Sequence, residues 1–195
     1  MSAFLGPIHF WLYNKIRFQE DLIDALCVRA VSEGWLTAED TQQFVSTDRR
    51  ELQDAIDESN IHGWLQGRIH DGEGRYAALV TTLLQEDANR LQTLKDVAFY
   101  TGKEKRTEVP TTAPEAFHQL DNTLLNGMPC DQVMKVTESN PDKVVWEETQ
   151  DLHSSFWNGQ GAYYYDLRAE LIKGILADSG LTFKQTDTNR YEIIK

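Results

Sequence analysis

The chain reads I-H-F-W-L-Y-N-K-I over residues 8–16 and I-H-G-W-L-Q-G-R-I over residues 61–69. Both stretches follow the pattern I-H-x-W-L-x-x-[K/R]-I, and in both a glutamate stands four residues further on, Glu20 and Glu73. Because histidine and tryptophan are among the seven positions that agree, the pattern indicates a duplicated structural unit.

Both copies are predicted to lie on long helices. Apolar residues recur at helical spacing from residue 8 to about residue 32, and Asn60 is a favourable N-cap for the second copy. Gly63 and Gly67 each cost that helix about 1 kcal/mol relative to alanine. We therefore expect a neighbouring helix to approach closely over their face. The apolar pattern continues to Gly102, either as one helix or as two helices that break near residues 85–87.

Two shorter helices are predicted between the copies. One starts at Thr37 and ends near Val45, and the other is capped by Ser46 or Thr47 and runs through Ile56.

The last third of the chain changes period. Thr112 and Glu115 form a capping box for a helix that ends near Gly127. The turn at 140–143 lies between two strand-like runs, a helix follows over 163–179, and 181–194 is a second hairpin. The predicted fold is α+β and mostly α. It consists of an N-terminal helical bundle of two related units (1–110), then a helix and a small ββαββ layer packed on the bundle (111–195).

Composition excludes several classes of partner. The net charge of −12 argues against nucleic acid and against an anionic membrane surface. The chain contains no apolar run of about 20 residues and starts with no signal-like segment. With only two cysteines, Cys27 and Cys130, it fits a reducing compartment. We expect a cytoplasmic protein.

The repeat suggests a metal site. Residues 11 apart on a helix share a face about 16 Å apart along the axis, so the histidine and glutamate of one copy cannot bind one ion together. If the two helices are parallel, His9 faces His62 and Glu20 faces Glu73. If they are antiparallel, each histidine meets the other copy's glutamate. Such a donor set suits iron, zinc or manganese.

Two alternative roles of the repeat stay open. The duplicated stripe is the core of the bundle in the first, with each histidine bonded to a carboxylate or a carbonyl group. In the second, the stripe is a homodimer interface.

A second group of residues, 151–168, combines aromatic, amide and histidine side chains ahead of a helix. His153, Trp157, Tyr164 and Arg168 are the candidate ligand-binding residues, since a helix N-terminus and an arginine suit an anionic or aromatic small molecule. Alternatively, these aromatic side chains only seal the contact between the layer and the bundle.

In outline, the order of helices followed by ββαββ resembles bacterial haem-based gas sensors and vinyl-reductase-like ligand-binding domains. The place of a haem-ligating histidine holds Thr123 or Leu124, and His118 lies six residues earlier. No residue role is therefore taken from the resemblance.

The leading functional hypothesis is a sensor-like protein that binds a small ligand or a metal between the bundle and the C-terminal layer. The alternatives are a homo-oligomeric interaction protein whose repeat is only structural, and an enzyme that uses His153 and Arg168.

Overall fold

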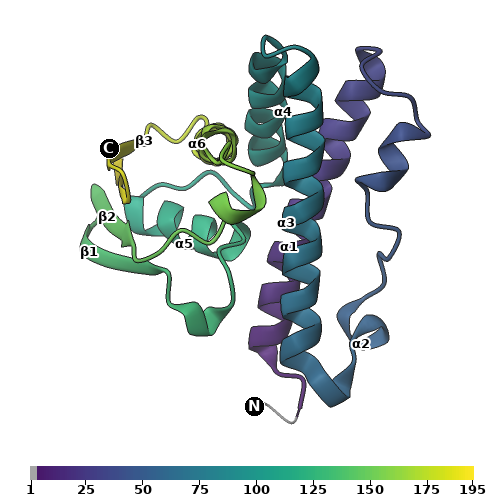
Figure 1. The fold of residues 1–195 in the computed structure, drawn as a ribbon. Helices are drawn as coiled ribbons and strands as arrows, with labels where there is room; N and C mark the ends of the chain where they lie inside the picture. The colour runs from purple at the N-terminus through teal and green to yellow at the C-terminus, as the bar shows by residue number, and fades with distance from the viewer. Residues whose placement is uncertain (1–3) are drawn as a thin grey trace.

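The computed structural model describes residues 4–195 and confirms the predicted class, a mostly helical α+β fold. The helices are α1 (Pro7–Ser32), α2 (Leu52–Ala55), α3 (Ile61–Glu86), α4 (Arg90–Lys105), α5 (Ala113–Thr123) and α6 (Ala162–Ile175). The strands are β1 (Met134–Asn140), β2 (Lys143–Glu148), β3 (Thr182–Asp187) and β4 (Arg190–Ile194). No helix within residues 4–195 has the length and apolar character that crossing a membrane requires. Figure 1 shows α1, α3 and α4 together, with the sheet, α5 and α6 beside them.

The ends of the long helices follow from local chemistry. Pro7 stands in the first turn of α1, where its missing N–H is not needed. Asn60 caps α3 by accepting a hydrogen bond from the Gly63 N–H at 3.2 Å. The backbone of Asp87 is extended (φ −155°, ψ 111°), so the chain breaks there and α3 and α4 are two helices.

The two copies of the repeat run parallel. Ile8 and His9 of α1 line the same pocket as Ile61 and His62 of α3, and further along Glu20 reaches α3 at Gly72. Five apolar positions of the repeat form one buried cluster with Tyr13, with Leu52 of α2 and with the loop after α5: Leu12, Tyr13, Ile16, Leu52, Ile61, Leu65, Ile69, Leu125 and Met128. The repeat therefore builds a core. Figure 1 shows the segment between α1 and α3 returning the chain to the start of α1.

Two predicted features of the bundle are wrong. Residues 33–60 contain a 3₁₀ turn at Asp40–Gln43 and the single-turn α2 in place of two longer helices, because polar side chains outnumber apolar ones there and only Phe44 and Leu52 are fully buried. No helix approaches closely over Gly63 and Gly67: a β-carbon at Gly63 would meet only the Asn60 side chain, and one at Gly67 would meet nothing within 4 Å.

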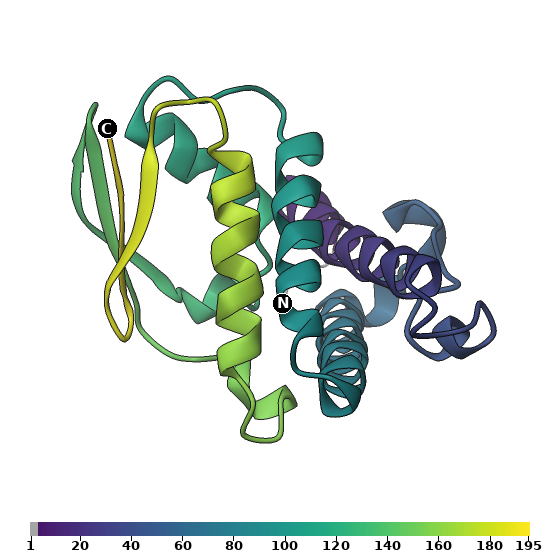
Figure 2. The same ribbon diagram turned by 90° about the horizontal axis from the view of Figure 1, so that it is seen from above.

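The close helix contact lies instead between α4 and α6. A β-carbon at Gly102 would be 2.2 Å from the Leu171 carbonyl oxygen, and one at Gly174 would be 1.9 Å from that of Phe99. Two glycines thus let the helix backbones touch. Figure 2 shows α4 and α6 side by side.

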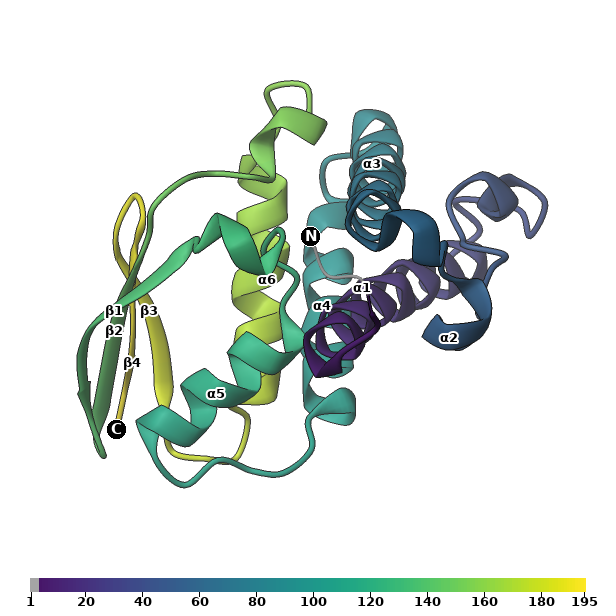
Figure 3. The ribbon, with the colours of Figure 1, turned by 90° about the horizontal axis from the view of Figure 1, so that it is seen from below.

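The four strands form one antiparallel sheet in the order β1-β2-β4-β3, which confirms both predicted hairpins. Trp146 of β2 pairs with Val136 on one side and with Tyr191 on the other. Helices α5 and α6 lie between this sheet and the bundle (Figures 2 and 3). One core cluster runs through all three layers, from Leu22 and Leu83 to Trp146 and Ile193.

Candidate functional site

A chain of buried polar groups joins the bundle to the C-terminal layer. Its centre is His153, in the loop before α6, where only 2% of the residue is exposed. Its Nδ1 lies 3.1 Å from Glu73 Oε1 on α3, and its Nε2 lies 3.0 Å from the Tyr164 hydroxyl on α6. When Nδ1–H donates to Glu73, Nε2 accepts from Tyr164.

The chain of contacts continues to the sheet. Asn126, in the loop after α5, donates its amide to Glu148 Oε1 at 3.2 Å. Its Oδ1 lies 3.3 Å from His153 Nε2 and accepts a hydrogen bond from it only when Nε2 carries a proton. Glu148 ends β2 and forms a buried ion pair with Arg168 of α6. Glu148 thus has the charged partner that a buried carboxylate requires, and Glu73 has a hydrogen bond to His153.

Local structure fixes the position of His153. The Asp151 carboxylate accepts hydrogen bonds from the backbone N–H groups of His153 (2.9 Å) and Ser154 (3.0 Å) and holds the turn. Burial acts to raise the pKa of Asp151, but hydrogen bonds from Ser154, Tyr165 and His153 outweigh it and lower the pKa to about 2. The imidazole stacks on Tyr164, with ring centroids 3.9 Å apart.

Burial raises the pKa of Tyr164 well above its ordinary value. Its hydroxyl therefore stays protonated and has a proton to donate when His153 Nε2 is unprotonated.

Three of the four predicted ligand-binding residues, His153, Tyr164 and Arg168, meet in this network. The fourth, Trp157, is fully buried and packs on Tyr76 (ring centroids 5.3 Å apart) and Tyr164 (6.0 Å). Around Tyr164 and Arg168 the free space is about 30 Å³, enough for one or two water molecules. Ligand binding by these four residues stays a prediction.

A larger pocket of about 190 Å³ lies on the side of the network that faces α3. Glu73 and His153 form part of its wall, and the other lining side chains include Ile69, His70, Met128, Leu152 and Phe156. His70 is exposed and meets the Phe156 ring edge-on, with centroids 5.6 Å apart.

Gly127, with φ +72°, lets the loop after α5 pass along this pocket. A side chain there would clash with Leu152, since a β-carbon would lie 2.2 Å from its Cδ1.

The predicted metal residues lie in separate places. His9 and His62 line one pocket of about 220 Å³, together with Glu58 and Cys130. The His9 Nδ1 accepts a hydrogen bond from the Gly6 N–H at 2.9 Å, so the neutral ring carries its proton on Nε2.

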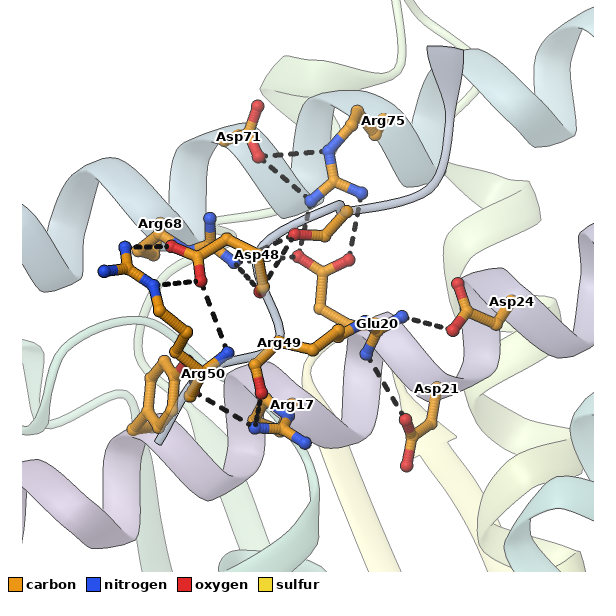
Figure 4. Close-up of polar contacts among 12 residues, drawn as sticks. Arg17, Glu20, Asp21, Asp24, Asp48, Arg49, Arg50, Arg68, Asp71 and Arg75 are labelled. Carbon is orange, nitrogen blue, oxygen red and sulfur yellow. Dashed lines mark hydrogen bonds and ion pairs between the residues drawn. The ribbon is translucent and has the colours of Figure 1, made fainter. Parts of the chain in front are cut away.

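Glu20 is only 1% exposed, and both of its carboxyl oxygens accept hydrogen bonds from an arginine. Arg75 donates to both of its carboxyl oxygens, through Nη1 at 2.9 Å and through Nη2, and Arg75 also binds Asp71. Figure 4 shows this pair among the arginines and aspartates that join α1, α3 and residues 48–50. Glu73 is bound to His153, so the two glutamates of the repeat have different partners.

Within residues 4–195, no three His, Cys, Asp or Glu side chains are arranged to hold a metal ion. Metal binding by the residues of the repeat therefore stays a prediction.

Sequence reasoning missed Asn126 and Glu148, which complete the network. Glu148 stands in a plain acidic pair at the end of a strand, and Asn126 stands where a helix stop is expected. The local pattern contains no signal for either role, since both depend on contacts with residues about 20 positions away. Comparisons of this chain with protein-family models, curated proteins and solved structures found no significant match.

Proposed function

We propose that the protein binds a small molecule in the pocket beside Glu73 and His153, where α3 meets the C-terminal layer. The observation that carries the proposal is the state of Glu73. It is 2% exposed, it lines the pocket, and within residues 4–195 its Oε2 has no hydrogen-bond partner, whereas Oε1 holds His153. A buried carboxyl oxygen without a partner costs about 1–3 kcal/mol, and a donor on a ligand would remove that cost.

The lining defines the chemistry of the ligand. An acceptor oxygen calls for an N–H or O–H group, and a cationic nitrogen suits a carboxylate best. Phe156, Leu152, Ile69 and Met128 offer an apolar surface beside it. The net charge of −12 favours cations over anions in general. We therefore infer a small organic amine with an apolar or aromatic part.

Binding of benzylamine, with benzoate as the anionic control, tests the proposal. Calorimetry and thermal shift on the full chain should show that benzylamine binds and benzoate does not. Glu73→Gln, which keeps an oxygen for His153, should weaken benzylamine binding at least tenfold. Glu86→Gln, at an exposed position of the same helix, should leave binding unchanged. Equal binding by both probes, or no effect of Glu73→Gln, would contradict the proposal.

A second candidate function is metal binding at His9 and His62. The observation in its favour is that both imidazoles, one from each copy of the repeat, share a pocket with Cys130. Binding there requires His9 to give up its bond to Gly6.

Elemental analysis of protein purified without chelator or added metal tests this second function. It should find near-stoichiometric metal that is lost in the folded His9→Ala/His62→Ala variant and kept in His118→Ala, which changes an exposed histidine elsewhere. Metal-free wild-type protein would contradict it.

A further inference from the structure

Lys15 is a buried amine with few partners. It lies on α1 with 3% of the residue exposed, and its Nζ is 3.8 Å from Asp121 Oδ1, which is longer than a hydrogen bond. On the other side the Nζ stands 4.0 Å from the centre of the Trp11 ring. The Trp11 ring is itself held, because its Nε1 donates to Asn122 Oδ1 at 2.8 Å.

The second copy of the repeat shows what a purely structural cation looks like at this position. The equivalent residue is Arg68, which likewise lies over its tryptophan, Trp64, at 5.8 Å. Arg68 donates to Ser46 Oγ at 3.1 Å and lies 3.8 Å from Glu20. The first copy instead has an amine, whose carboxylate partner is 39% exposed.

Lys15 also lines a pocket, between α1 and the loop after α5. The pocket has a volume of about 220 Å³, and its lining includes Trp11, Asp121, Asn126, Met128 and Val133. It is separate from the pocket of the proposed function, although Gly127 and Met128 line both. A small molecule in this space would lie beside a lysine nitrogen.

We propose that Lys15 is a nucleophilic amine that captures a small uncharged aldehyde or ketone as a Schiff base in this pocket. The neutral nitrogen attacks the carbonyl carbon and forms a C–N bond. The resulting carbinolamine then loses its oxygen as water and leaves a C=N bond. The overall change is amine plus carbonyl compound to imine plus water, with no oxidation or reduction.

The surroundings of Lys15 supply the neutral amine that this step needs. Burial lowers the pKa of Lys15 to about 8; the charge of Asp121 on α5 acts against the shift, and that of Arg168 on α6 adds to it. At pH 7.5 about a quarter of a group with that pKa is neutral, against roughly 0.1% of an ordinary lysine. Buried lysines of this kind serve as Schiff-base nucleophiles.

The walls of the pocket select the carbonyl compound. Trp11, Met128 and Val133 are apolar, and the Asp121 carboxylate beside the amine repels an anion. Once the imine is protonated, the same carboxylate is its counter-ion. An uncharged aldehyde therefore fits better than a 2-oxo acid.

Reductive trapping on the full chain tests the proposal. Butyraldehyde and cyanoborohydride are added at pH 7.5, and peptide mass spectrometry locates the alkylated lysines. We expect Lys15 to react at least tenfold faster than the exposed Lys184 and Lys195. Glyoxylate should react at Lys15 at least fivefold more slowly than butyraldehyde.

Two variants act as controls. Lys15→Arg, which installs the residue of the second copy, should abolish the fast phase while circular dichroism shows a folded chain. Lys95→Arg, which changes a lysine 3.6 Å from Asp166, should leave the fast phase unchanged. If wild-type Lys15 reacts no faster than the exposed lysines, the proposal is wrong, and this holds whether or not benzylamine binds at Glu73.

Discussion

At the scale of single residues, Arg75 is the group on which the buried Glu20 depends. Arg75→Ala removes both hydrogen bonds to a carboxylate that is 1% exposed, and Arg68 at 3.8 Å is too far to replace them. An unpaired buried charge costs about 3–5 kcal/mol. We expect a loss of that order in the free energy of unfolding, measured by urea denaturation.

Arg49→Ala provides the matched control for this prediction. Arg49 pairs with Asp21 and Asp24 in the same group of charges (Figure 4). Its side chain, however, is 29% exposed. Exposed pairs contribute about 0–1 kcal/mol. Equal losses in the two variants would contradict the assignment of Glu20 as a buried ion that needs Arg75.

Lys15 gives the molecule a pH dependence of known sign. Burial lowers its pKa from 10.5 in the unfolded chain to about 8 in the folded protein. Between these two pKa values the unfolded chain binds more protons than the folded protein, so the free energy of unfolding rises with pH. Below pH 8 the folded protein carries the full cost of burying the charged Lys15 amine. Relative to Lys15→Met, the wild type should gain up to about 3 kcal/mol between pH 8 and pH 10.5.

The measurement for Lys15 is the difference in the free energy of unfolding between wild type and Lys15→Met at several pH values. Tyrosines that titrate in the same range cancel in that difference. A difference that stays constant from pH 7 to pH 10.5 would show that the amine is solvated like an ordinary lysine.

At the scale of elements, Gly102 of α4 and Gly174 of α6 allow the close helix contact that positions the C-terminal layer. Gly174→Ala places a β-carbon 1.9 Å from a backbone oxygen, so the helices must separate. Overpacking of this kind costs about 1–3 kcal/mol or more, and we expect a clear fall in Tm. Gly67→Ala and Gly74→Ala, where nothing lies within 4 Å, should raise stability by about 0.5–1 kcal/mol. A Tm for Gly174→Ala at or above that of the wild type would contradict this packing.

Elements are predictable where the chain carries its own stop and start signals. The capping box of Thr112 and Glu115 and the N-cap at Asn60 begin helices where expected. The break at Asp87 is not decided by the sequence, because a single extended residue between two amphipathic helices leaves no mark in the apolar pattern. The close helix contact is made at Gly102 and Gly174, and not at Gly63 and Gly67. Gly102 and Gly174 lie on α4 and α6, which are far apart in sequence, so the sequence pattern does not relate them.

At the scale of the whole molecule, the candidate site is likewise predictable only where its residues are close in sequence. His153, Tyr164 and Arg168 can be predicted as a group because they are close in sequence. Glu73, which holds His153, lies 80 residues away, and the sequence relates it only to the repeat. Lys15 is visible in the repeat, but only the fold shows that it faces a pocket beside Asp121.

The bundle and the layer should unfold as one unit. Their shared core cluster runs from Leu22 on α1 to Ile193 on β4, and α4 buries Leu94, Ala98 and Gly102, the last of them against α6. A chain cut at residue 110 would expose that face of α4 and leave Glu73 without His153.

Circular dichroism at 222 nm and tryptophan fluorescence should therefore report coincident urea transitions for the full chain. The two probes weight different regions when fluorescence is read from a Trp11→Phe/Trp35→Phe/Trp64→Phe variant. Helical signal comes mostly from the bundle, whereas the two remaining, fully buried tryptophans, Trp146 and Trp157, lie in the C-terminal part. Fragment 1–110 should show no cooperative transition of its own. Separate midpoints, or a fragment that unfolds cooperatively, would mean that the polar network and the α4–α6 contact join two independent domains. A ligand bound at Glu73 would then act by changing how those domains dock, which is a different mechanism from binding to a fixed pocket.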